Sequence, residues 1–334
     1  MVKKTLIYLT KQSMKKLFTK IAIAVAGFTG VAVAQQDPQF TQFMHNRLIY
    51  NAGYAGTSRA MCGNIQFRQQ WSAFDGAPQS LALAFDMPLA GLPLGVGLNV
   101  ITDKIGPMNT LFLRVPVSFN KVIGKGTLGI GLEVGILQKK IDNNWITPEP
   151  GKVDNYIPGN YDALSNPSLN KLTYDLGFGA FYQIPGKMYL GLSSAHLPAQ
   201  TVKGTDKLIY EMTRHYYLMG GYSFDINPRN KITPNVKMKS DVAATAVDVN
   251  LTYMYDNMIW VGGTYRLSDA AAVMIGYQGK SASGGLNYKI GYSYDITTSG
   301  LKGYTGGTHE IILGFCLLQK VKKISTYGDD RFLN

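Results

Sequence analysis

Hydrophobic and polar residues alternate one by one along most of the chain from about residue 60 onward. In the stretch 126–136 every even position from 128 is aliphatic, while the odd positions are Thr, Gly or Glu. The stretches 247–255 and 286–295 repeat this alternation with Val, Leu, Ile and Tyr on one side. Because successive side chains of a strand point to opposite faces, each stretch predicts a β-strand with one apolar and one polar face.

The alternating segments are about ten residues long and are separated by Gly, Pro, Asn or Asp, which is typical of outer-membrane barrels. A soluble antiparallel sandwich also alternates, but its outer face normally carries many charges. Here only 16% of residues are charged, and the 21 tyrosines gather toward the expected strand ends, as aromatic girdles do. The sequence therefore favours a transmembrane β-barrel over a soluble β protein.

The segments can be counted. An even number of strands puts both ends of the barrel on the periplasmic side, where an exported chain starts. We expect an all-β, up-and-down antiparallel barrel of about fourteen strands, at residues 60–71, 79–87, 94–102, 108–120, 126–140, 171–184, 187–196, 213–226, 231–240, 244–255, 257–267, 270–279, 284–296 and 308–319.

The connections between these strands differ in length in a regular way. Short turns at 184–187, 227–230 and 256–257 fall on the side expected to be periplasmic. The longest connections, at 141–170, 198–212 and 297–308, fall on the opposite side. Outer-membrane barrels have short periplasmic turns and long surface loops, so the lengths agree with the orientation inferred from the even count.

The polar face of the strands carries charges of both signs, and in a membrane barrel that face lines the lumen. A barrel of fourteen strands is wider than one that its own side chains fill and narrower than an open porin. A plug from a loop or a terminus is therefore expected. The charges assigned to the lumen are Arg68, Arg114, Glu133, Asp175, Lys237, Lys239, Asp248, Lys289, Asp295 and Glu310.

The ends of the chain divide into separate segments. Residues 1–34 hold six lysines, an apolar stretch of 14 residues at 21–34 and a small-x-small ending, which predicts a cleaved signal peptide. Met14, followed by two lysines, is an alternative start. Without the six lysines the 33 basic residues become 27 against 21 acidic ones, so the net charge falls from +12 to +6. A charged periplasmic tail is expected at 320–334, after the barrel at 60–319.

Residues 35–59 precede the first strand and lack regular alternation. They carry seven large apolar or aromatic side chains that need a buried environment. We expect this segment to pack into or across the periplasmic mouth and to narrow the pore. Those side chains belong to Phe40, Phe43, Met44, Leu48, Ile49, Tyr50 and Tyr54.

The two cysteines, Cys62 and Cys316, share the inward parity of the first and last strands. Closure of a barrel makes these strands neighbours, and the destination is oxidising, so a disulfide across the seam is one hypothesis. Two unpaired small residues are the other. A separation of more than about 7 Å between the Cα atoms would exclude the bond.

Signals of chemistry are absent from the sequence. His45, His196, His215 and His309 are scattered without metal-ligand spacing, and no nucleophile elbow, P-loop or zinc-protease motif is present. We therefore expect no catalytic residue, no cofactor and no metal. A membrane-embedded hydrolase, which assembles its site from adjacent strands without a local motif, is an alternative. An exported chain also has no evident nucleic-acid partner.

Four blocks in order along the mature chain resemble the PorP/SprF family of type IX secretion membrane proteins of Bacteroidetes. The first block holds Asp37, Pro38, Gln39, Phe40, Tyr50, Asn51, Tyr54 and Gly56. The others are 68–71 with 75–78, 103–107, and 292–296 with 306–310. The chain departs from the family at Asn46-Arg47 and Asn51-Ala52, where Asn-Pro is usual.

The resemblance implies a barrel in outer-membrane lipid that helps to deliver or anchor secreted proteins such as gliding adhesins. It also implies contact with a periplasmic lipoprotein and with ring components of the type IX machine, and with the secreted cargo protein. It implies no catalysis. The alternative from another functional class is a general diffusion porin for small polar solutes.

Overall fold

The computed structural model describes residues 37–73, 75–141, 169–203, 209–241, 243–281, 285–300 and 302–318. The expected signal peptide, the charged tail and residues 142–168 of the longest connection lie outside this part of the chain. No helix among the described residues is long and apolar enough to span a membrane.

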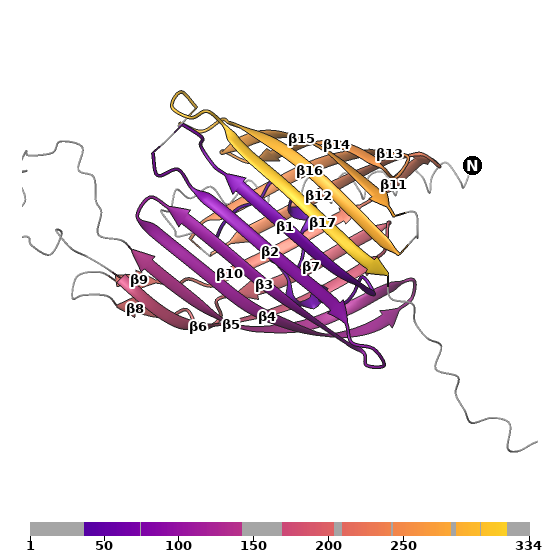
Figure 1. Cartoon of the computed structure of the whole chain (residues 1–334), viewed down its shortest axis with the longest axis horizontal. Helices are drawn as coiled ribbons and strands as arrows, with labels where there is room; N and C mark the ends of the chain where they lie inside the picture. Colours follow the sequence, from indigo (N-terminus) through magenta and orange to yellow (C-terminus); the bar gives the residue numbers. More distant parts are fainter. Residues whose placement is uncertain are drawn as a thin grey trace, which may run out of the picture.

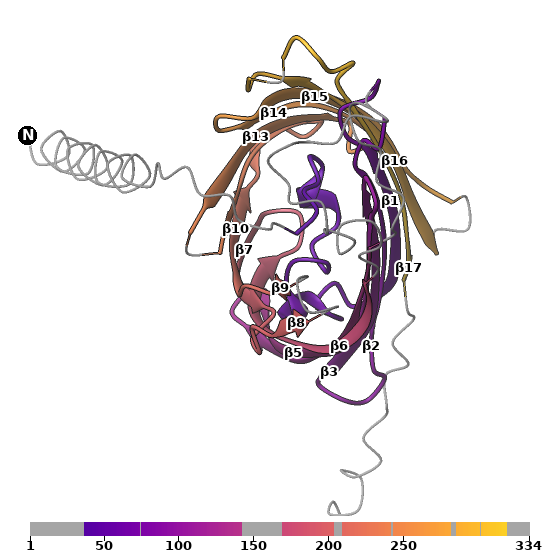
Figure 2. The same cartoon turned by 90° about the vertical axis from the view of Figure 1, so that its left-hand side faces the viewer.

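Antiparallel strands form one closed ring, seen from the side in Figure 1 and along its axis in Figure 2. Neighbours in sequence pair with each other, and β1 pairs with β17 to close the seam. The strands are β1 Ala60–Gln69, β2 Gln79–Pro88, β3 Leu94–Ile105, β4 Met108–Ile123, β5 Gly126–Ile141, β6 Leu169–Ile184, β7 Met188–Ala195, β10 His215–Tyr222, β11 Phe224–Asn227, β12 Asn230–Ser240, β13 Thr245–Tyr255, β14 Ile259–Arg266, β15 Ala270–Lys280, β16 Leu286–Thr297 and β17 Thr308–Leu318.

The predicted fold is confirmed: the ring has fourteen antiparallel strands in up-and-down order. β10 and β11 together make the strand expected at 213–226, with a break at Ser223. The largest errors in the expected ends are three residues, at β3 and β4. β3 continues to its turn because Asp103 still points inward, where its carboxylate accepts a hydrogen bond from Ser80. β4 continues because its ladder with β5 extends to the pair of Ile123 and Gly126.

One element was not expected. Within the connection between β7 and β10, β8 (Thr201–Lys203) and β9 (Ile209–Glu211) form a separate two-stranded sheet. This hairpin lies at the end of the barrel that carries the long connections, which we call the loop end (Figure 1). The opposite end, where β6 joins β7 and β13 joins β14, is called the turn end.

The apolar face of the strands forms the outer wall. Leu132 and Leu192 are each 62% exposed, and Val273 is 60% exposed, although all three lie within strands. The residues on either side of them in sequence face inward and are buried, and they include Gly131, Glu133 and Met274. Lipid accepts a sheet only when every backbone group is paired within it, and the closed ladder meets that condition.

The interior is filled by residues 37–59, which we call the plug. It includes two short 3-10 turns, η1 (Phe43–His45) and η2 (Ala52–Tyr54), and is the indigo segment inside the ring in Figure 2. Phe40 and Phe43 are no more than 1% exposed. The plug packs against inward apolar residues of the strands, such as Phe181 and Trp260, and this is the core of the molecule.

The plug extends further than the sequence suggested. We expected it to pack into or across the periplasmic mouth, but it starts at the loop end, where Asp37 contacts His196 after β7. It ends at the turn end, where Gly56 N–H donates to the Asp86 carboxylate and the chain enters β1. The cause is the length of the segment. About 20 residues that include extended stretches are long enough to run from one end of the barrel to the other, because the strands of the ring are only 8 to 16 residues long.

The seam carries a covalent bond. Cys62 of β1 and Cys316 of β17 stand opposite each other in the ladder, with Cα atoms 4.1 Å apart, and their sulfur atoms form a disulfide. Of the two alternatives that the sequence left open, the structure contains the bonded pair. The bond joins the first strand to the last near the turn end.

We expect the double substitution C62S/C316S to lower the free energy of unfolding by about 2–4 kcal/mol, because the bond limits the unfolded chain. The measurement is urea unfolding of the refolded protein in detergent, followed by tryptophan fluorescence. Wild-type protein treated with reductant serves as the control and should match the variant. Equal midpoints for oxidised wild type and variant would contradict the prediction.

Candidate functional site: the plug and the lumen wall

The backbone of the plug is held by side chains that project inward from the strands, which we call the lumen wall. Three wall lysines donate to plug carbonyl oxygens: Lys239 Nζ to Asp37 at 2.8 Å, Lys237 Nζ to Phe40 at 3.3 Å, and Lys289 Nζ to His45 at 2.6 Å. A segment without regular secondary structure cannot pair these carbonyls internally. The wall lysines supply the missing donors.

Uncharged wall residues do the same in the second half of the plug. The side-chain amide of Asn99 donates to the Leu48 carbonyl at 3.1 Å, and that of Asn120 donates to the Ala55 carbonyl at 2.9 Å. On the plug itself, the Asn51 amide donates to two strand carbonyls at 3.1 Å, and its oxygen caps η2 by accepting from Gly53 N–H.

One charged group of the lumen wall binds the plug backbone at Thr41 and Gln42. Arg68 lies 2.8 Å from an oxygen of Asp295 and 3.0 Å from an oxygen of Glu310. The Glu310 carboxylate also accepts the backbone N–H groups of Thr41 and Gln42, at 2.7 and 2.8 Å. All these groups are at most 2% exposed, so the ion pairs and the plug backbone form one buried network.

A second charged group lies beside the first. Asp248 accepts from Lys237 Nζ and Arg266 Nε, each at 2.8 Å, and Arg266 reaches an oxygen of Asp295 at 3.7 Å. Lys237 also lies 4.9 Å from the ring centre of Phe43. Arg266 was missed in the sequence, although it shares the inward parity of Thr264 and Trp260, which is the signal that could have identified it.

A third charged group is built around Arg114. Its Nε lies 2.8 Å from Asp175, and Glu133 is 3.9 Å away. Asp175 in turn contacts His196, which contacts Asp37 at the start of the plug. The ten charges expected in the lumen are thus placed on the inner side of their strands, nine of them fully buried and Lys289 half-buried.

Glycines of the wall let the plug approach closely. A Cβ on Gly53 of the plug would lie 2.7 Å from the Gly129 carbonyl oxygen and 2.8 Å from that of Gly179. A Cβ on Gly131 would lie 2.5 Å from the Ala52 backbone. Because these neighbours are backbone atoms, any side chain at Gly131 must displace the plug. The paired glycines of β5 and β6 therefore make room inside the barrel.

Aromatic contacts fix the plug laterally. The Tyr54 ring packs edge-on against Phe181 at 5.1 Å between ring centres, and the Arg47 guanidinium lies 3.8 Å above the Tyr189 ring. His45 packs on Trp260 at 4.8 Å. These contacts bury the large side chains that the sequence left without a partner.

The environment of the plug also sets its charges. Burial by itself would raise the pKa of Asp37, but its electrostatic interactions with His196 and His215 and its hydrogen bond with His196 hold that pKa well below 3.8. Burial, together with the charges of Lys289 and Arg47, holds the pKa of His45 well below 6.5. Asp37 is therefore a carboxylate and His45 a neutral ring at neutral pH.

Residues 32–315 match the family described as type IX secretion system membrane protein PorP/SprF. A comparison with curated proteins gave no match. Similar solved structures include the Pseudomonas putida toluene transporter TodX, at 9% identity, 81% of this chain, 93% of that chain and a TM-score of 0.46. The Acinetobacter baumannii outer membrane protein Omp33 is 8% identical over 78% of this chain and 98% of that chain, with a TM-score of 0.40. The translocator domain of autotransporter NalP from Neisseria meningitidis is 13% identical over 83% of this chain and 95% of that chain, with a TM-score of 0.41.

The substitution R68Q should lower the free energy of unfolding by about 3–5 kcal/mol, because it removes the cation that pairs with buried Glu310 and the nearer of the two cations that pair with Asp295. The matched control is K187Q, which removes an exposed pair with Asp225 and should cost less than about 1 kcal/mol. Urea unfolding in detergent measures both. Hydrogen exchange at residues 40–43 should rise in R68Q only, and similar losses in both variants would argue against a central role for this network.

Proposed function

Because the chain belongs to the PorP/SprF family of type IX secretion system membrane proteins, we propose that it is a sealed scaffold that helps to deliver or anchor a secreted protein at the cell surface. The observation that carries this proposal is the plug, which occupies the lumen from one end of the ring to the other. A filled barrel offers surfaces for binding at both ends and no path for a solute.

The size of the remaining spaces favours a scaffold over the alternative of a diffusion porin. In the described part of the chain, three cavities lined by plug residues have volumes of about 110, 70 and 10 Å³, and a wider cavity of about 680 Å³ lies at the turn end beside Lys289 and Cys316. One buried water needs about 10–15 Å³ of such space, so the cavity of about 110 Å³ holds several waters and the cavity of about 10 Å³ holds one at most. A sugar would need a continuous path several times wider.

The two ends of the barrel suit different partners in this proposal. With the loop end outward, the connections at 142–168 and 298–307 meet the secreted cargo, such as a gliding adhesin. The turn end and the tail at 320–334 then face the periplasmic lipoprotein and the ring components. The residues of the lumen serve to hold the plug, and we assign them no catalysis.

Sealing can be tested by liposome swelling in isotonic sugar. Wild-type protein should give no swelling above empty liposomes, whereas G131V, or deletion of residues 37–56, should give rapid swelling because the plug is displaced. The matched control is G263V, since a Cβ on Gly263 has no neighbour nearer than 3.7 Å. Swelling by the wild type at the rate of a plug-free variant would identify a porin.

The secretion role is tested in the native bacterium. Deletion of the gene should remove at least one secreted protein from the cell surface, measured by proteomics of shaved cells, while uptake of small nutrients stays unchanged. A copy carrying G263V should restore the surface protein. Loss of nutrient uptake with an unchanged surface proteome would favour the porin and contradict the proposal.

A further inference from the structure

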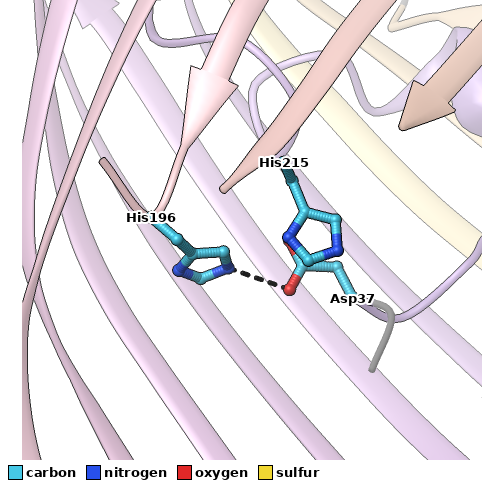
Figure 3. Close-up of side chains that lie close together, drawn as sticks. All are labelled: Asp37, His196 and His215. Atoms are coloured by element: carbon cyan, nitrogen blue, oxygen red, sulfur yellow. Dashed lines mark hydrogen bonds and ion pairs between the residues drawn. The ribbon is translucent and has the colours of Figure 1, made fainter. Parts of the chain in front are cut away.

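Three side chains with metal-ligating atoms converge at the loop end of the lumen, where no function has been assigned. Asp37 comes from the plug, His196 follows β7, and His215 is the first residue of β10 (Figure 3). One ligand atom from each lies within 4.8 Å of the other two. We propose that they form a zinc-type metal site that fastens the start of the plug to the lumen wall. This inference goes beyond the proposed function and does not depend on it.

His215 shows the clearest sign of a missing partner. Its side chain is buried, at 3% exposure, and its Nδ1 lies 3.1 Å from the Thr213 carbonyl oxygen, which can only accept. The ring proton is therefore on Nδ1, and Nε2 presents a lone pair. This Nε2 has no hydrogen-bond partner. A buried acceptor without a donor is costly, and a metal ion would satisfy it.

His196 has the surroundings of a metal-bound histidine. Its Nδ1 lies 3.1 Å from Asp175, and its Nε2 faces Asp37 Oδ1 at 2.9 Å. A ligating histidine usually donates its other ring N–H to a carboxylate, which fixes the ring and strengthens the ligand. Asp175 occupies that outer position. In the metal-free structure His196 Nε2 and Asp37 Oδ1 form an ion-paired hydrogen bond, and a metal ion would take the place of the proton between these two atoms.

The remaining atoms of Asp37 are already engaged, which leaves Oδ1 as its ligand atom. Its Oδ2 accepts from the Tyr217 hydroxyl at 2.7 Å, and its backbone oxygen accepts from Lys239. Three positive charges nearby are unfavourable for a cation: Arg114 Nη2 lies 3.3 Å from His196 Nε2, Lys239 Nζ lies 2.8 Å from the Asp37 carbonyl oxygen, and Lys139 lines the adjacent cavity. Arg114 keeps its pairs with Asp175 and Glu133, and these carboxylates offset its charge.

The donor set and the available space point to Zn²⁺. Two imidazole nitrogens and one carboxylate oxygen, with water as fourth ligand, are an ordinary zinc set. The cavity of about 110 Å³ beside the three residues is lined by Pro38 and Thr213 as well, and it has room for that water. Ligand atoms of tetrahedral zinc are about 3.4 Å apart, so the farthest atoms, at 4.8 Å, must approach by rotation of side chains.

The test is zinc binding to the full mature chain, purified in detergent without a histidine tag and stripped with chelator. We expect one Zn²⁺ per chain by mass spectrometry after dialysis, and a tetrahedral absorption spectrum when Co²⁺ replaces it. H215Q should lower the affinity by about 10–100-fold or abolish binding. Zinc should also slow hydrogen exchange at residues 37–41 of the wild type.

The matched control is H309Q, which removes an exposed histidine of β17 whose ring contacts Tyr292 and Tyr294, and it should bind zinc like the wild type. The proposal would be overturned if the wild-type protein binds no stoichiometric zinc; the contact between His196 and Asp37 would then be explained by a shared proton. It would also be overturned if H215Q and the wild type bind zinc equally. If H215Q does not fold, the stoichiometry and the exchange measurement on wild-type protein decide the question.

Discussion

The structure depends on one constraint: the irregular backbone of the plug lies inside a ring where little water can reach it, so its polar groups need partners from the wall. A strand of the barrel meets this requirement through the ladder, but residues 37–59 form only short turns of their own. Lysine, asparagine and carboxylate side chains of the wall take the place of a ladder. The interior is polar because it serves the backbone of this segment.

This constraint explains why so many charges are buried. Buried ion pairs stabilise a fold only when the geometry is good and every remaining polar atom has a partner. Glu310 meets that condition with an arginine, a glutamine amide and two backbone N–H groups of the plug. Removal of the plug would leave the same carboxylate with half its donors. The plug and the charged wall therefore stabilise each other, and neither is a complete structure alone.

The sequence was sufficient to predict the strands of the ring but not the path of the plug inside it. Alternation located every strand of the ring, because the pleat gives each residue a face and lipid requires one face to be apolar. Arg266 and Asp86 also stand at inward positions of this alternation, but they were not identified as lumen residues from the sequence. The path of the plug had no such signal. Asp37 meets His196 across 159 positions, and no spacing rule connects an irregular segment to the end of a distant strand.

The two ends of the plug are held in different ways, and this difference bears on how the seal could open. At the turn end the plug continues into β1, which is bonded to both neighbouring strands and joined to β17 by the disulfide. At the loop end only side chains hold it, and after cleavage behind Ala34 Asp37 would be the third residue of the mature chain. A partner that displaces the contacts of Asp37 would therefore free the plug from the loop end inward, while the turn end stays fixed. The cluster of Asp37, His196 and His215 lies at the point where such a release would begin.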